Sequence, residues 1–93
     1  MMSYFIYILR SSKSYHYYIG SAADPDERLV RHNAGATPST KIGRPWKIVY
    51  TEIFPTKTDA LKREIYLKRM KSKTYLENLI RENETGQGAI PVG

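Results

Sequence analysis

The spacing of hydrophobic and polar positions predicts two strands near the N-terminus and a third in the middle of the chain. Ser3–Arg10 is rich in aromatic and β-branched residues without polar alternation, which is typical of a strand covered on both faces. The turn Ser11–Ser14 separates it from a second run, Tyr15–Gly20, so the two strands form a hairpin. Trp46–Phe54 is predicted as the third strand.

The first helix is predicted from the signals at its two ends. Asp24 is a good N-cap, Pro25 suits the first helical position, and Glu27 completes a capping box. The helix is expected to run to about Ala34 and to stop at Gly35, a natural residue for the position after a helix.

Two more helices are predicted after the third strand. Lys57–Met70 forms a helix with Thr56 or Thr58 as its cap, Ser72–Arg81 forms a shorter one, and the polar segment Ala36–Pro45 is a loop. The order β-β-α-β-α-α predicts an α/β (α+β) fold, in which helices flank a small, mainly antiparallel, three-stranded sheet.

Length and terminal composition predict one domain and a tail. Ninety-three residues make one small domain, and residues 1–82 hold the predicted elements. Residues 83–93 contain three glycines and a proline without periodicity, so a disordered tail is predicted there. The N-terminal apolar run is too short to cross a bilayer and lacks signal-peptide features. A soluble cytoplasmic protein with no membrane partner is therefore expected.

Composition and charge narrow the chemistry. The chain has no cysteine, which excludes disulfides and a Cys-based zinc site. Its formal net charge of +6 at pH 7 is typical of a protein whose partner carries many phosphates. Many small soluble proteins are equally basic, so charge alone leaves nucleic-acid binding as one of two open interpretations.

Two tyrosines are predicted to face each other across the hairpin. The hairpin is expected to close symmetrically over Ser11–Ser14, which puts Tyr7 directly opposite Tyr18. Cross-strand partners share one face of a sheet, with Cβ atoms about 4.5–5.5 Å apart. The pair is either a packing contact or part of a polar site, and its spacing leaves both open.

The first helix places a cation and an imidazole together. Arg28 and His32 are spaced i,i+4, so they project from one face of the helix. The alternative is a solvated arginine with a histidine that interacts with the helix dipole near the C-terminus.

The second helix carries a carboxylate where a core residue is expected. Its predicted apolar arc consists of Ala60, Leu61, Ile65 and Leu67. Glu64 falls inside this arc, and a carboxylate there costs stability unless it is paired or bound to a metal. Lys68 lies one turn further on, so an ion pair and a metal ligand both stay open.

Together these positions resemble the pattern of the GIY-YIG nuclease family. The pattern comprises Ile6-Tyr7, Tyr18-Ile19-Gly20 eleven residues on, Arg28 eight past the glycine, His32 four further, and a later helical glutamate. Asp24–Gly35 and Asp59–Met70 are especially similar to the short bacterial single-domain members. The resemblance covers residues 3 to about 80, and the family's fold agrees with the predicted order of elements.

The resemblance implies a metal-dependent DNA endonuclease that hydrolyses phosphodiester bonds in DNA repair or recombination. Tyr7 would be the general base toward a water, or its orienter, with Tyr18 as its partner against the phosphate. Arg28 would stabilise charge on the phosphoryl oxygens, and His32 would assist proton transfer. Glu64 would be the protein ligand of Mg²⁺ or Mn²⁺. A phenol with its usual pKa near 10 needs positive charge nearby to act as a base, which Arg28 and the metal would supply.

The chain departs from the family pattern at three places. Phe5 stands where the family name has glycine, and Ser21 stands where some repair nucleases carry lysine. Larger members also place a late asparagine in the active site, whereas Asn78 and Asn83 fall in the last helix or the tail. These departures keep open the alternative of a catalytically inactive nucleic-acid-binding module with the same fold, although the five polar positions favour the enzyme.

Two basic groups are predicted to contact phosphates. The first group lies in and next to the loop before the third strand and comprises Lys41, Arg44 and Lys47. The second lies at the end of the second helix and comprises Lys68, Arg69, Lys71 and Lys73. Trp46 lies within the first group and is expected to anchor the core rather than to stack on a base. Because no second DNA-binding module is present, weak and largely sequence-independent DNA binding is expected, with any specificity supplied by a separate protein.

Overall fold

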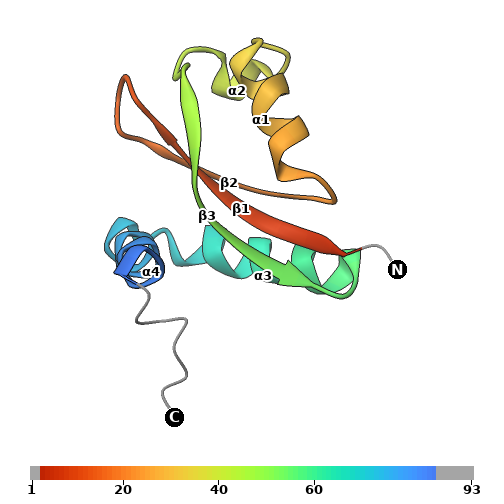
Figure 1. The fold of residues 1–93 in the computed structure, drawn as a ribbon. Helices are drawn as coiled ribbons and strands as arrows, with labels where there is room; N and C mark the ends of the chain where they lie inside the picture. Colours follow the sequence, from red (N-terminus) through yellow and green to blue (C-terminus); the bar gives the residue numbers. More distant parts are fainter. Residues whose placement is uncertain (1–2, 86–93) are drawn as a thin grey trace.

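A three-stranded sheet lies between helices on both of its faces (Figure 1). The structure is a computed structural model and describes residues 3–85. The strand order is β2-β1-β3, and both outer strands are antiparallel to β1. In chain order the elements are β1 Tyr4–Ser11, β2 Tyr17–Ala22, α1 Pro25–Asn33, α2 Pro38–Lys41, β3 Trp46–Phe54, α3 Lys57–Met70 and α4 Lys73–Thr85. The predicted α+β fold and the order of its main elements are confirmed.

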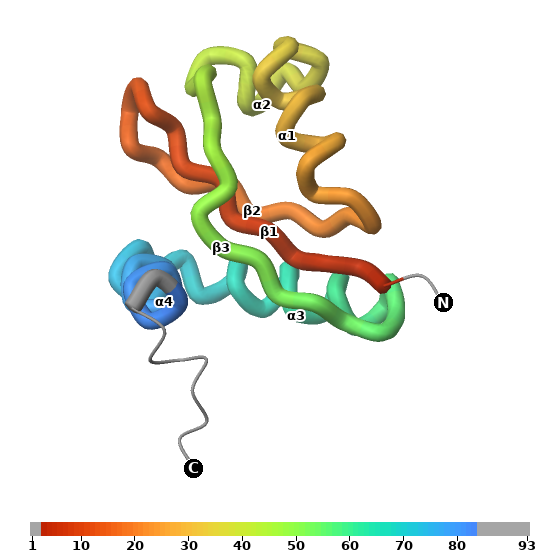
Figure 2. The backbone as a smooth tube through the Cα atoms, in the orientation of Figure 1, coloured from red at the N-terminus to blue at the C-terminus, as the bar shows by residue number. Residues whose placement is uncertain are grey.

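The central strand β1 is buried on both faces, as its sequence predicts. Ile6, Tyr7, Ile8 and Leu9 are each at most 1% exposed. The two isoleucines belong to an apolar core with α3 and α4, and the other two residues belong to a second core on the side of α1. In Figures 1 and 2 the sheet separates α1 and α2 from α3 and α4, so each face has its own core.

The hairpin closes over Ser12–Tyr15 rather than over the predicted Ser11–Ser14. Ser11 is fully buried, and its Oγ accepts hydrogen bonds from two backbone N–H groups of the loop, at 3.0 and 3.1 Å. Tyr15 ends the loop in the left-handed conformation, with φ at 62°, and its N–H donates to the Ser11 carbonyl at 3.0 Å. These contacts hold Ser11 within the strand and shift the loop by one residue.

Because the loop begins one residue later than predicted, the residues that face each other across the hairpin also differ from the prediction. Tyr7 lies opposite Gly20, so the prediction that it lies directly opposite Tyr18 was wrong. A shift of the partner by two residues leaves every side chain on its face of the sheet. The two tyrosines therefore remain diagonal neighbours, with ring centroids 6.4 Å apart.

The capping residues predicted at the two ends of α1 are found in the structure, with one exception. Asp24 Oδ1 accepts a hydrogen bond from the backbone N–H of Glu27 at 3.2 Å, and Gly35 follows the helix with φ at 83°. The Glu27 carboxylate pairs with Arg31 Nε at 2.6 Å instead of completing the predicted capping box. The segment predicted as a loop also contains α2, which begins at a proline and forms one short helical turn.

The predicted apolar arc of α3 was half wrong. Ala60 and Leu67 are buried, whereas Leu61 and Ile65 are 44% and 46% exposed. The buried stripe follows the spacing i, i+4, i+7, and Glu64 is its middle member.

α4 is longer than predicted. It runs to Thr85, past the predicted end at Arg81, so the start of the predicted tail is helical. Residues 86–93 of that tail lie outside the described residues. Within residues 3–85 no helix is long and apolar enough to cross a membrane.

Candidate active site

The site begins at Tyr7, whose ring lies across Gly20 of β2. A Cβ atom added to Gly20 would lie 2.6 Å from both the Cζ and the hydroxyl oxygen of Tyr7, far inside normal contact distance. Tyr7 is 1% exposed and comes from the central strand, so its ring is held by backbone on one side and by the α1 core on the other. The glycine is therefore needed for a close approach between ring and backbone.

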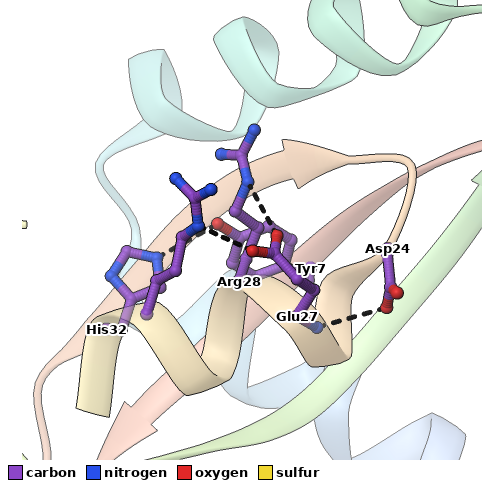
Figure 3. A network of polar contacts seen from close by, with 6 residues as sticks. Tyr7, Asp24, Glu27, Arg28 and His32 are labelled. Carbon is purple, nitrogen blue, oxygen red and sulfur yellow. Dashed lines mark hydrogen bonds and ion pairs between the residues drawn. The ribbon is translucent and has the colours of Figure 1, made fainter. Parts of the chain in front are cut away.

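A chain of hydrogen bonds runs from Tyr7 into the protein, and Figure 3 shows its first contact, between Tyr7 and His32. The Tyr7 hydroxyl lies 3.2 Å from His32 Nε2, and His32 Nδ1 lies 2.8 Å from the Thr40 hydroxyl. Thr40 in turn donates to the carbonyl of Thr37 at 3.2 Å. His32 and Thr40 are both buried, so this chain is shielded from water.

The order of donors in this chain follows from the number of protons available. A hydroxyl has one proton, and that of Thr40 is used on the Thr37 carbonyl, so Thr40 accepts from His32. His32 then carries its proton on Nδ1, which leaves the lone pair of Nε2 to accept the Tyr7 hydroxyl. The network therefore orients His32 as an acceptor for the proton of Tyr7.

Burial favours the neutral form of both groups. It raises the pKa of Tyr7 to about 12, with a further rise from Tyr18, and Arg28 opposes this by its charge and a hydrogen bond. Burial also lowers the pKa of His32 below its usual 6.5, and the positive charge of Arg28 lowers it further. Arg28 thus favours an ionised Tyr7, but the desolvation of the phenol outweighs it.

Tyr18 and Arg28 lie at the open side of this network. The Tyr18 ring centroid lies 4.8 Å from that of His32, and the side chain is half-buried. The Arg28 side chain is exposed and lies 3.7 Å from a carboxylate oxygen of Glu27 on the same helix (Figure 3). Four of the five predicted polar residues are therefore together on the α1 face, and the guanidinium is accessible from solvent.

Glu64 reaches the site from the other face of the sheet. α3 contributes it beside β2, where Glu64 Oε1 accepts a hydrogen bond from Ser21 Oγ at 2.6 Å. Oε2 pairs with Lys68 Nζ at 2.6 Å, so the ion pair left open by the sequence is present. The Lys68 ammonium also lies 5.8 Å from the ring centroid of Tyr18, which links Glu64 to the α1 face around the edge of β2. The charge of Glu64 contributes to the raised pKa of Tyr7.

The Glu64 carboxylate keeps unused lone pairs, although Lys68 already neutralises its charge. Among the described residues there is no group of three or more His, Cys, Asp or Glu side chains that would enclose a metal. Mg²⁺ usually takes one or two carboxylates with substrate phosphates and retained waters, so an enclosing group is not required. Ser21 and Lys68 each occupy one lone-pair site, which leaves one on each carboxylate oxygen.

The predicted phosphate-contacting residues fall in separate places. Lys41 and Arg44 line a hollow of about 540 Å³ beside α2, whereas Lys68, Lys71 and Lys73 line a groove of about 410 Å³ along β2. Lys47 lines neither and lies on β3, and Arg69 is exposed on α3.

Trp46 is buried, and its Nε1 donates to the Thr40 carbonyl at 2.8 Å, which confirms it as a core anchor. The same contact fixes the backbone of Thr40 beside His32. Sequence reasoning missed both Thr40 and the hydrogen bond from Ser21 to Glu64. Ser21 was visible as a departure from the family pattern, but Thr40 lies in a predicted loop and carried no local signal.

The chain belongs to the GIY-YIG family. The family's model, described as the GIY-YIG catalytic domain, matches residues 3–78. Membership places the protein in a nuclease superfamily and implies interaction with nucleic acid.

Named relatives are bacterial. The chain is 44% identical over 69 residues to a UPF0213 protein of Staphylococcus saprophyticus, covering 73% of this chain and 83% of the relative. It is 42% identical, with the same coverage, to a UPF0213 protein of Staphylococcus aureus. A solution NMR structure of the UPF0213 protein BH0048 from Bacillus halodurans superposes with a TM-score of 0.56 at 26% identity, covering 99% of this chain and 98% of that one.

Proposed function

We propose that this protein is a cytoplasmic, metal-dependent DNA endonuclease that hydrolyses phosphodiester bonds in repair or recombination. The observation that carries the proposal is the directed chain from Tyr7 through His32 to Thr40. Burial alone requires an acceptor for this hydroxyl, but here the acceptor is an imidazole whose own proton is held on its other nitrogen by Thr40, so it is free to take a second proton. Here the hydroxyl is shielded on one side and borders a cationic surface on the other.

The pKa values of the pair restrict how Tyr7 acts. Moving its proton to His32 in the resting site transfers it from a group of pKa about 12 to one below 6.5. Both shifts favour the neutral pair, so the phenol and not a tyrosinate is the resting form. Tyr7 therefore accepts a proton from the attacking water as it releases its own to His32, in one concerted transfer.

Positive charge at the open side lowers the barrier to this transfer. Arg28 already favours the ionised phenol, and its exposed guanidinium is placed to hold phosphoryl oxygens. Tyr18, beside the His32 ring, orients the phosphate against Tyr7. Glu64 would hold Mg²⁺ or Mn²⁺, which supplies further positive charge to the phosphate oxygens when bound.

DNA binding through exposed lysines and arginines is expected to be weak and largely independent of sequence. A separate protein would then supply specificity. Several of these cations line two separate hollows, one beside α2 and one along β2, which would let phosphates bind at more than one place.

The test is cleavage of plain duplex, flapped, branched and single-stranded DNA under Mg²⁺ or Mn²⁺, with Glu64→Gln as the comparison. Glu64→Gln keeps the side-chain shape and an acceptor for Ser21 while removing the charge that binds the metal. We expect cleavage by the wild type, none by the variant, and nearly unchanged DNA binding. Asp59→Asn, in the exposed first turn of the same helix, is the matched control and should cleave like the wild type.

The second candidate is a nucleic-acid-binding module without turnover. It is favoured by one observation, because Lys68 and Ser21 already neutralise and bond the Glu64 carboxylate. DNA binding by the wild type without cleavage of any of these substrates, under either metal, establishes this function instead.

A further inference from the structure

A groove of about 410 Å³ leads away from the site along the edge of β2. Tyr18 and Lys68 line it, and Lys68 also binds Glu64, so the groove adjoins the site. Its apolar floor consists of Ile19, Leu67 and Leu76.

The lining of this β2-edge groove combines rings with cations. Tyr17 and Tyr18 contribute aromatic rings, and Lys68, Lys71 and Lys73 contribute cations, of which Lys68 is paired with Glu64 outside the lining. Stacking surfaces beside a line of cations are the combination that binds unpaired nucleotides, with bases on the rings and phosphates on the lysines. The volume is at the lower end of small-molecule pockets, so it fits one or two nucleotides rather than a duplex.

A second hollow of about 240 Å³ continues the groove, because Tyr17 lines both. Arg10 and Lys47 line this hollow and lie directly opposite each other on β1 and β3, an unfavourable arrangement of like charges. Arg10 Nε is buried and has no hydrogen-bond partner within the described part of the chain. Glu77 also lines the hollow but leaves this atom unsatisfied. A phosphate bound in this hollow would offset the repulsion between the two cations.

We propose that the β2-edge groove and this second hollow hold an unpaired stretch of DNA strand next to the phosphate that is cut. The substrate class is therefore DNA with a single-stranded segment beside the cleavage point, such as a flap, a splayed end or a single strand. The cleavage part of this inference rests on the proposed function, whereas the binding part does not.

Binding is measured without metal, so that it is separate from catalysis. Fluorescence anisotropy in EDTA compares oligothymidylates of about four and about twelve nucleotides, lengths that span the range held by small single-strand-binding domains, with a hairpin duplex. We expect the wild type to bind the longer single strand at least about tenfold more tightly than the duplex. Equal or tighter duplex binding overturns the proposal.

Variants locate the strand on the protein. Lys71→Gln with Lys73→Gln should weaken binding of both oligothymidylates and reduce the slope of log K against log salt by about 1.4, at about 0.7 per phosphate contact. Lys57→Gln with Lys62→Gln removes the same charge from exposed positions of α3 outside the groove and should change neither. An equal loss in this control pair would mean general attraction and contradicts the groove.

Two further variants test the path. Tyr17→Leu keeps an apolar side chain and removes the ring, and should weaken single-strand binding about tenfold because one base loses its stacking surface. Lys47→Gln should weaken binding of the longer oligothymidylate and leave the shorter one unaffected. Weaker binding of both oligothymidylates, or of neither, contradicts the continuation of the strand into the second hollow. Tight single-strand binding with these losses but without cleavage in metal supports the groove and rejects the nuclease.

Discussion

The two faces of β1 are equally buried, but they are built with different chemistry. On the α3 and α4 side, Ile6 and Ile8 pack into a core whose buried members are all apolar. On the α1 side, Tyr7 is just as buried, and its neighbours include the polar His32 and Thr40. One strand therefore carries a structural face and a polar face at alternate residues.

The difference teaches how this fold holds a reactive group still. An apolar contact is non-directional, so the first face fixes the sheet without orienting any proton. A buried polar group must be hydrogen-bonded, so each donor on the second face has a definite acceptor. Changes on the polar face should therefore reduce activity, whereas changes on the apolar face should reduce stability.

Removing the Tyr7 hydroxyl should give the largest effect. Tyr7→Phe keeps the ring over Gly20 but removes the proton that passes to His32, so the cleavage rate should fall about a thousandfold, within the usual range for acid–base groups. The melting temperature should fall only slightly, because the ring packing is kept and His32 Nε2 alone loses its donor. The matched control is Tyr50→Phe, which removes a hydroxyl bonded to Glu52 on the apolar side and should leave the rate unaltered. Equal rates for wild type and Tyr7→Phe would reduce the tyrosine to a packing residue.

Truncating the neighbouring apolar residue should show the opposite pattern. Ile8→Ala leaves a cavity in a fully buried position and should lower the free energy of unfolding by about 2–5 kcal/mol. Urea denaturation measures the loss, and cleavage is measured below the transition and normalised to folded protein. A normalised rate far below that of the wild type would show that the two faces are not independent.

Adding a methyl group at Gly20 should moderately lower both the stability and the cleavage activity. Gly20→Ala forces the Tyr7 ring away and should cost about 1–3 kcal/mol of stability together with activity. In the background of Tyr7→Ala the same change should cost almost nothing, because the ring it meets is gone. An unchanged cost in that background would assign the effect to the strand itself.

The smallest expected effect is a pH dependence of stability. Because the pKa of folded His32 lies below 6.5, the unfolded chain binds its proton first, and stability is lost as pH falls below about 6.5. Between pH 7.5 and 5.5 the loss should be at most about 1.4 kcal/mol. His32→Gln should remove this part of the dependence, whereas His16→Gln, at the exposed position directly after the hairpin loop, should retain it. Denaturation at the two pH values compares them, and equal slopes for the wild type and His32→Gln contradict the assignment.

Local patterns predicted most elements because the signals lie within a few residues. The three strands, α1 and α3 appear at or near their predicted positions, since capping residues and apolar spacing act over one or two turns. Two exposed residues of α3 were wrongly predicted to be in the core, because hydropathy is also a purely local signal. Leu61 and Ile65 look like core residues by hydropathy, but the sheet meets the helix along the narrower stripe of Ala60, Glu64 and Leu67.

The hairpin register and the partners of the polar residues needed the folded chain. Ser11 bonds to the Gly43 carbonyl at 2.6 Å, a contact across 32 residues that helps to keep it in the strand and delay the turn. The local sequence of the hairpin does not include Gly43, so a local pattern could not reveal this contact. The predicted pairing was therefore displaced, while the face of each tyrosine was right.

The sequence by itself determined the family, the order of the main strands and helices, and which residue types are available for chemistry. These follow from motif spacing and from periodicities of two and 3.6, which are properties of a single segment. The tertiary structure alone decided that Thr40 orients His32, that Gly20 admits the Tyr7 ring, and that Ser21 and Lys68 hold Glu64. It also decided that Tyr7 is harder to ionise than a free phenol, since desolvation depends on everything packed around the group and not on its neighbours in the chain.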